Sequence, residues 1–116
     1  MNKIKFMYTL KQKKYSSLIN NFFNKLFIKE NKFKNILITV IHVYINKIFN
    51  LANIYITVYP DIYKNKILYI LNIYKNKKKY KQKLSFFLKN KFKIPNLYFY
   101  LYNEKILEFL LLNKIK

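Results

Sequence analysis

Two neighbouring segments of the chain alternate between apolar and polar positions, and this period of two predicts β-strands. Residues 52–59 carry apolar side chains on one face and polar or tyrosine side chains on the other, as a strand with one buried face requires. Their predicted inward face comprises Ala52, Ile54, Ile56 and Val58. Residues 37–45 are apolar on both sides but carry His42 and Tyr44 on one of them. Residues 46–50 begin and end with asparagine, which predicts a hairpin between the two strands.

A third alternating segment, residues 97–102, follows Pro95, a residue that is tolerated at a strand entrance. Leu97, Phe99 and Leu101 are its predicted inward positions. The three segments together predict one small sheet with an apolar face and a tyrosine face. The predicted tyrosine face comprises Tyr44, Tyr55, Tyr59, Tyr98, Tyr100 and Tyr102.

Helical spacing of apolar residues predicts three helices around this sheet. Residues 11–30 repeat apolar side chains in steps of three and four, which gives one helical stripe. The same spacing predicts helices over 62–74 and 80–92, separated by a basic break at 75–79. Asp61 is the predicted cap of the first of them. The fold class is therefore α+β, in the order helix, strand, strand, helix, helix, strand.

The length of 116 residues predicts a single domain, 1–116. Its core covers about 10–102, and 103–116 form a short C-terminal helix or tail, with Asn103 as its cap. The first residues do not read as a signal peptide. The chain contains no Gly and no Cys, is dominated by Lys, Ile, Asn, Tyr and Phe, and retains Ala52 as its only alanine. This usage indicates an AT-rich genome, and the absence of cysteine excludes disulfides and thiolate metal sites.

The formal net charge of +20 arises from 24 Lys against four acidic residues. Codon bias explains Lys in place of Arg, but it does not explain the scarcity of acids. Such a charge opposes a compact monomer unless a polyanion neutralises it, which indicates nucleic acid or an anionic surface as partner. A transmembrane helix is not expected, because the longest lysine-free stretch, 48–63, is short of about 20 apolar residues and is interrupted by polar ones.

Candidate catalytic chemistry is missing from the sequence. His42 is the only histidine and lies in the middle of a predicted strand. It is interpreted as an ordinary residue of the sheet rather than as a catalytic one. No carboxylate pair or metal-ligand cluster is recognisable, and a phosphate loop needs glycine. We therefore expect no enzyme activity, no catalytic residue, no metal, no cofactor and no small-molecule substrate.

The densest basic cluster is the predicted RNA-binding site. It comprises Lys75, Lys77, Lys78, Lys79, Lys81, Lys83, Lys89 and Lys91. Point charges on an accessible element, together with helix ends that present backbone N–H groups, favour phosphate contact. The alternative is that these lysines form an ordinary solvent-exposed face and that codon bias has raised their number. For the tyrosine face the alternatives are a stacking platform for bases and the ordinary strand preference for tyrosine, and the second is favoured.

The element order and three motifs resemble the ribosome-binding factor A family, which has a type II KH-like domain of order αββααβ. Its strand pair has the form T-V-x-x-V-x-h-s-x-D-L-x-x-A-x-V-Y-V, and residues 39–56 align without a gap as TVIHVYINKIFNLANIYI. The family's final P-E-L-x-F is matched by residues 95–99, PNLYF. The resemblance covers about residues 10–110. It implies a three-stranded sheet covered by helices on one face.

The chain departs from the family pattern at three places. The family's Ala-x-Gly kink between its second and third helices is absent, and Asn76 is the candidate for that kink because asparagine tolerates left-handed dihedrals. The usual Asp of the hairpin turn is Ile48. The usual Arg residues appear as Lys, which keeps phosphate contact but loses bidentate geometry.

The resemblance implies a monomeric, non-catalytic factor that binds the free, immature small (30S) ribosomal subunit through its 16S rRNA and assists late maturation and 5′-end processing. It implies the bacterial cytoplasm of an AT-rich organism, or an organelle stroma. Two other classes stay open: a structural ribosomal protein or other basic RNA-binding protein, and a peripheral membrane-surface protein. The membrane class is disfavoured because helix 11–30 is only mildly basic on its polar side.

Overall fold

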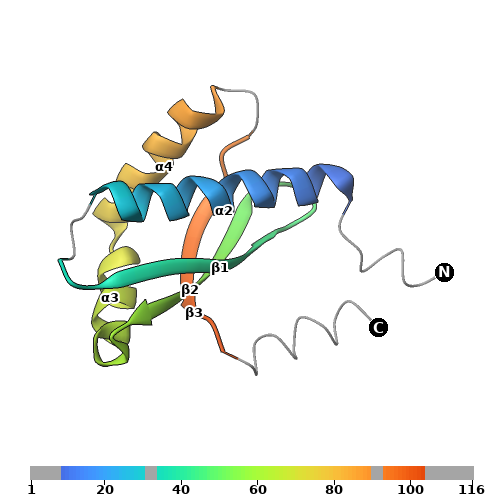
Figure 1. The fold of residues 1–116 in the computed structure, drawn as a ribbon. Coiled ribbons are helices and arrows are strands. Elements are labelled where there is room, and N and C mark those ends of the chain that lie inside the picture. Colours follow the sequence, from blue (N-terminus) through green and yellow to red (C-terminus); the bar gives the residue numbers. More distant parts are fainter. Residues whose placement is uncertain (1–8, 31–33, 90–92, 104–116) are drawn as a thin grey trace.

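The computed structural model describes residues 9–30, 34–89 and 93–103. The elements are, in chain order, helix α2 (Leu10–Glu30), strands β1 (Leu37–Ile45) and β2 (Leu51–Tyr59), the 3-10 turn η1 (Asp61–Tyr63), helices α3 (Lys64–Leu71) and α4 (Tyr74–Leu88), and strand β3 (Asn96–Leu101) (Figure 1). The predicted helix or tail beyond Asn103 lies outside the described residues.

The three strands form one mixed sheet in the order β1-β2-β3. β1 and β2 are antiparallel and are joined by the predicted hairpin, whereas β2 and β3 are parallel. In the hairpin, Asn46 Oδ1 accepts hydrogen bonds from the backbone N–H groups of Asn50 and Leu51 at 3.0 and 3.1 Å. The predicted α+β class with a three-stranded sheet is confirmed.

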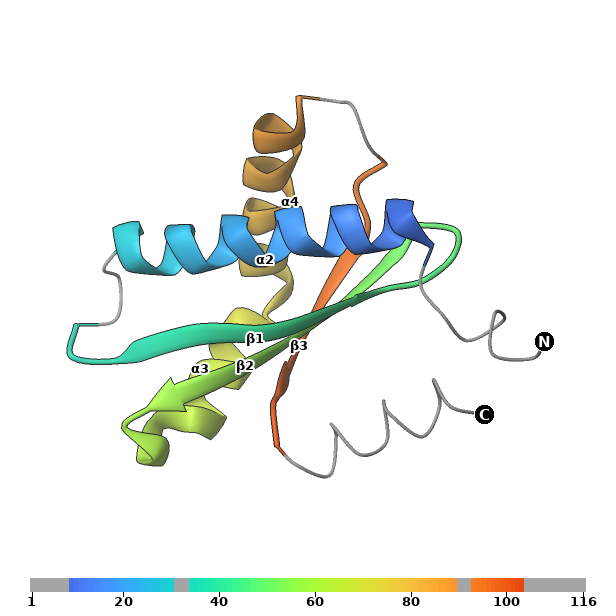
Figure 2. The same cartoon turned by 45° about the vertical axis from the view of Figure 1, so that its right-hand side comes forward.

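The core lies between one face of the sheet and the three helices (Figures 1 and 2). The predicted inward residues of β2 are buried, with Ala52, Ile54 and Ile56 fully so. Each helix contributes fully or almost fully buried side chains to the same cluster: Tyr15, Ile19 and Phe23 from α2, Ile67 and Leu71 from α3, and Tyr80, Leu84 and Leu88 from α4. Because the buried strand residues share one face, the opposite face of the sheet is left without a helix among the described elements.

A β-bulge in β1 changes which side chains face the core. Val40 pairs with Ile56 and His42 pairs with Tyr55, so Ile41 is an extra residue that has no partner of its own. Beyond the bulge Val43 and Ile45 are buried, while His42 and Tyr44 lie half-buried on the tyrosine side.

At each edge of the sheet, one backbone position is paired with a side-chain amide. At the β1 edge, Val40 N–H donates to Asn24 Oδ1 at 2.8 Å, and Asn24 Nδ2 donates to the Val40 carbonyl at 3.2 Å. Asn72 makes the matching pair with Phe99 at the β3 edge, at 3.0 and 2.9 Å. Each side-chain amide makes the two hydrogen bonds that the backbone of an adjacent strand would make. Another strand therefore cannot pair with these backbone positions.

The break between the second and third helices lies at 72–73, not at 75–79 as predicted. α3 ends at Leu71 and α4 begins at Tyr74. The lysine-rich residues continue the helix because lysine is a good helix former, whereas the amide of Asn72 is held by β3. The prediction that Asn76 forms a left-handed kink is wrong: positive φ values of described residues occur at Asn35, Phe49 and Lys89, and Asn76 lies inside α4. Its Nδ2 donates to the Ile70 carbonyl at 2.7 Å, which ties the two helices together.

The predicted capping role of Asp61 is also wrong. Asp61 lies in the first turn of η1, after Pro60 at the cap position, and no side chain of the described residues caps this turn. Asp61 instead pairs with Lys64 at 3.2 Å. The intervening 3-10 turn places the start of α3 at Lys64, out of reach of a cap from Asp61.

Candidate nucleic-acid interface

The predicted lysine cluster lies on α4 and the residue that follows it, where it divides into three rows. Side chains three, four or seven positions apart share one side of a helix. Lys79 and Lys83 face α2, Lys77 and Lys81 face β3, and Lys75, Lys78 and Lys89 face outward. Lys91 lies outside the described residues. One helix therefore brings the described lysines together, but it gives them different surroundings.

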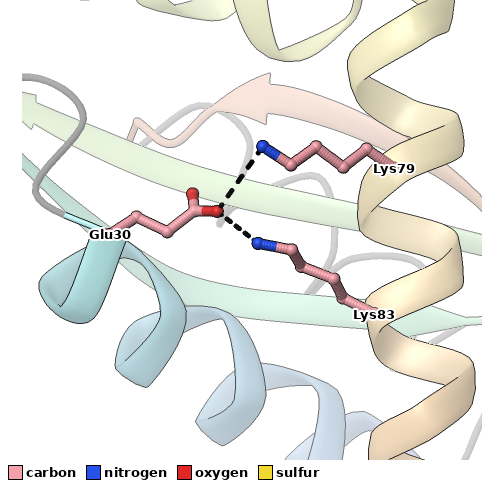
Figure 3. A network of polar contacts seen from close by, with 3 residues as sticks. All are labelled: Glu30, Lys79 and Lys83. Atoms are coloured by element: carbon pink, nitrogen blue, oxygen red, sulfur yellow. Dashed lines mark hydrogen bonds and ion pairs between the residues drawn. The ribbon is translucent and has the colours of Figure 1, made fainter.

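The row that faces α2 is paired with Glu30, the last residue of that helix (Figure 3). Lys83 Nζ lies 2.6 Å and Lys79 Nζ 3.9 Å from the same carboxylate oxygen. The Glu30 side chain is only 16% exposed. Two of the predicted phosphate ligands are thus partly neutralised by an acid that the sequence pattern did not connect with them.

The row that faces β3 reaches the edge strand of the sheet. Lys77 Nζ lies 4.3 Å from the centre of the Tyr98 ring, within the range of a cation–π contact. Lys81 Nζ donates a hydrogen bond to Asn96 Oδ1 at 3.0 Å. Tyr98 and Asn96 belong to the exposed side of β3. These lysines therefore join the basic helix to the tyrosine face.

The outward row is the most accessible part of the cluster. Lys75, Lys78 and Lys89 are exposed, and within the described ranges none of their side chains makes a hydrogen bond, an ion pair or a ring contact. At the start of α4, no side chain of the described residues caps the free N–H groups of the first turn. Lys75 and Lys78 lie in the first two turns, close to these N–H groups, and together they form a surface that attracts anions. Lys89 extends the row at the other end of the helix.

The tyrosine face is only partly open to solvent. Tyr59, Tyr98 and Tyr100 are exposed, whereas Tyr44, Tyr55 and Tyr102 are half-buried. Burial is the main cause that raises the pKa of Tyr55, and the neighbouring Tyr100 and Tyr44 raise it further. The Tyr55 hydroxyl is therefore neutral at physiological pH.

Three rings form a row across this face, one from each strand. His42 pairs with Tyr55 across β1 and β2, and Tyr55 pairs with Tyr100 across β2 and β3. The ring centres of His42 and Tyr55 are 5.9 Å apart, and those of Tyr55 and Tyr100 are 5.5 Å apart. Alternation along each strand could not predict this row, because it depends on the register between strands and on the bulge at Ile41.

His42 lines a shallow groove with Ser16 and Ser17, but the Ser16 hydroxyl donates to the Lys13 carbonyl at 3.0 Å. No cluster of three or more His, Cys, Asp or Glu residues suited to a metal ion occurs in 9–30, 34–89 and 93–103. Within the same ranges, no helix has both the length and the apolar character needed to cross a bilayer.

Comparison with models of known protein families and with curated proteins found no match to this chain.

Proposed function

We propose that this chain is a non-catalytic RNA-binding factor that docks on the immature small ribosomal subunit and assists its late maturation. The resemblance to ribosome-binding factor A suggests this role. The observation that carries the proposal is the outward row of α4, Lys75, Lys78 and Lys89, which are exposed and unpaired among the described residues. A ribosomal RNA surface supplies phosphates in the density that such a row requires.

The expected contact is with the phosphate backbone rather than with base edges. Lysine carries a compact charge on a flexible stem, so it neutralises phosphates without reading sequence. The free N–H groups at the start of α4 add directed donors next to Lys75. Affinity that is largely electrostatic should fall steeply as salt rises, because bound counterions are released.

The arrangement of the elements supports a type II KH-like fold as part of this proposal. The order helix, strand, strand, helix, helix, strand is as expected, with β2 parallel to β3. In this interpretation the junction at Asn72 and Ile73 takes the place of the family's kink. Binding would stabilise one conformer of the rRNA through a higher affinity for that conformer.

Co-sedimentation tests the proposal directly. The purified chain is mixed with small subunits, large subunits and intact ribosomes at graded salt, and bound protein is measured in each pellet. We expect binding to free small subunits and little to translating ribosomes. A triple variant, Lys75→Gln, Lys78→Gln and Lys89→Gln, should lose most of this binding. The matched control is Lys13→Gln, Lys14→Gln and Lys25→Gln, which removes the same charge from exposed positions of α2.

Two results would contradict the proposal. Equal binding of the two triple variants would mean that net charge alone, and not the outward row, drives association. Stable occupancy of translating ribosomes would identify a structural ribosomal protein rather than an assembly factor.

A further inference from the structure

The open face of the sheet presents a row of three rings that lies apart from the outward lysines of α4. We infer that this face binds unpaired RNA bases by stacking on the row of His42, Tyr55 and Tyr100, which we call the aromatic row. The inference rests on the proposed function and deepens it, because it specifies single-stranded RNA as the segment that reaches this face. Phosphates would lie along α4 and bases on the sheet.

The geometry of the aromatic row suits stacking. The rings of His42 and Tyr55 are inclined by 32°, and those of Tyr55 and Tyr100 by 27°, so successive rings are closer to parallel than to perpendicular. Tyr100 ends the row on the edge strand β3 and is 42% exposed. A base that stacks on Tyr100 would extend a series of rings that the strand register has already ordered. Pre-ordered rings lower the entropy cost of binding.

Positive charge borders the aromatic row on the side of α4. The outward positions of β3 are Asn96, Tyr98 and Tyr100 in succession, and a lysine ammonium contacts the first two of them. Lys81 lies on Asn96, and Lys77 lies over the Tyr98 ring. A strand of RNA that leaves the outward row of α4 therefore meets cations before it meets the rings.

The composition of the face favours RNA over a protein partner. Its described residues are mostly tyrosine, histidine, threonine and asparagine, and none of them is acidic. The aliphatic side chains are Leu37 and Leu51 at strand ends and Ile41 at the bulge, so they form no continuous apolar centre. Protein interfaces bury a larger apolar centre. Aromatic rings combined with a basic border are the pattern that binds single-stranded nucleic acid, because every base has a face on which a ring can stack.

The experiment compares two labelled oligoribonucleotides of equal length and charge, a run of uridines and an abasic ribose-phosphate chain. Binding to the full chain is followed by fluorescence anisotropy at fixed salt. We expect the uridine chain to bind at least about fivefold more tightly, because stacking on each base contributes about 1–3 kcal/mol. Equal affinities for the two chains would overturn the inference without any variant having to fold.

Two variants then locate the stacking site. Tyr100→Leu should weaken binding of the uridine chain by about 5- to 100-fold and leave binding of the abasic chain unchanged. Tyr69→Leu is the matched control, since Tyr69 is 73% exposed on α3, away from the sheet face, and it should change neither. If Tyr100→Leu weakens binding to small subunits but not to the uridine chain, the face meets a protein and the inference is wrong.

The outcomes also separate this inference from the proposed function. If both oligonucleotides bind equally well and in a salt-sensitive way, the inference that bases stack on the aromatic row is wrong, while the proposed function stands. Absence of binding to either oligonucleotide and to small subunits at low salt would overturn both.

Discussion

The side-chain amide of Asn72 forms two hydrogen bonds with the backbone of Phe99, one in each direction, at 2.9 and 3.0 Å. Asn72 also follows the last residue of α3, so the same residue ends a helix and closes a sheet edge. Asn24 makes the corresponding pair with Val40 at the opposite edge. Two asparagines thus tie the helical layer to the outer strands.

Asn72→Ala should lower the free energy of unfolding by about 1–3 kcal/mol, because it leaves a partly buried backbone donor and acceptor unpaired. Urea denaturation followed by circular dichroism measures the change. Asn65→Ala, at an exposed position of α3, is the control and should change stability by less than about 0.5 kcal/mol. Equal effects of the two substitutions would mean that the edge pairing adds no stability.

Glu30→Gln should destabilise the fold by about 1 kcal/mol at low salt, because it removes the carboxylate shared by Lys79 and Lys83. The loss should shrink at high salt as the pair is screened. Asp61→Asn is the matched control, since Asp61 is 80% exposed and pairs only with Lys64 among the described residues. A salt-independent effect of Glu30→Gln would indicate that packing, not charge, is lost.

The three rows of α4 lysines should separate stability from RNA affinity. Removing Lys75, Lys78 and Lys89 should flatten the slope of log affinity against log salt by about 2 to 3, with the free energy of unfolding unchanged or slightly raised. Lys83→Gln should instead lower stability and alter the slope by less than about 1, because Lys83 is held by Glu30. The slopes come from titrations at four or more salt concentrations. If Lys83→Gln flattened the salt slope and the triple variant did not, the RNA site would lie on the side of α4 that faces α2.

Ala52→Phe should lower the free energy of unfolding by about 1–3 kcal/mol through overpacking. Ala52 is fully buried and lies between Ile45 and Leu97 in the sheet. The sheet is closely covered there, since Gln12 of α2 donates to the Ile45 carbonyl at 2.9 Å. Thr57→Phe, at an exposed position of the same strand, is the control. A loss well below this range would mean that space remains above Ala52.

Stability should decline in alkali partly through Tyr80. Burial, and secondarily the charge of Glu30, raise the pKa of Tyr80 from 10.0 to about 12. The folded state then binds more protons than the unfolded state between pH 10 and 12, so stability falls as pH rises through this window. The free-energy difference between wild type and Tyr80→Phe should be constant below pH 10. Between pH 10 and 12 the wild type should lose stability relative to Tyr80→Phe, by about 1 kcal/mol per pH unit. Tyr69→Phe is the exposed control, and a flat difference up to pH 12 would contradict the role of burial.

The local pattern of the sequence determined the inward face of β2, the hairpin and the stripe of α2. Side chains alternate along any strand and recur every three or four residues along any helix, so these faces follow from backbone geometry alone. Ala52, Ile54 and Ile56 are accordingly buried as predicted.

Only the tertiary structure decided where α3 ends and which contacts each lysine of α4 makes. The end of α3 depends on Asn72 meeting Phe99, 27 residues away, and the pairing of Lys83 depends on Glu30, 53 residues away. The bulge at Ile41 places His42 on the open face, where the register of three strands aligns it with Tyr55 and Tyr100. These features arise from contacts between distant segments, and no period within a single segment encodes them.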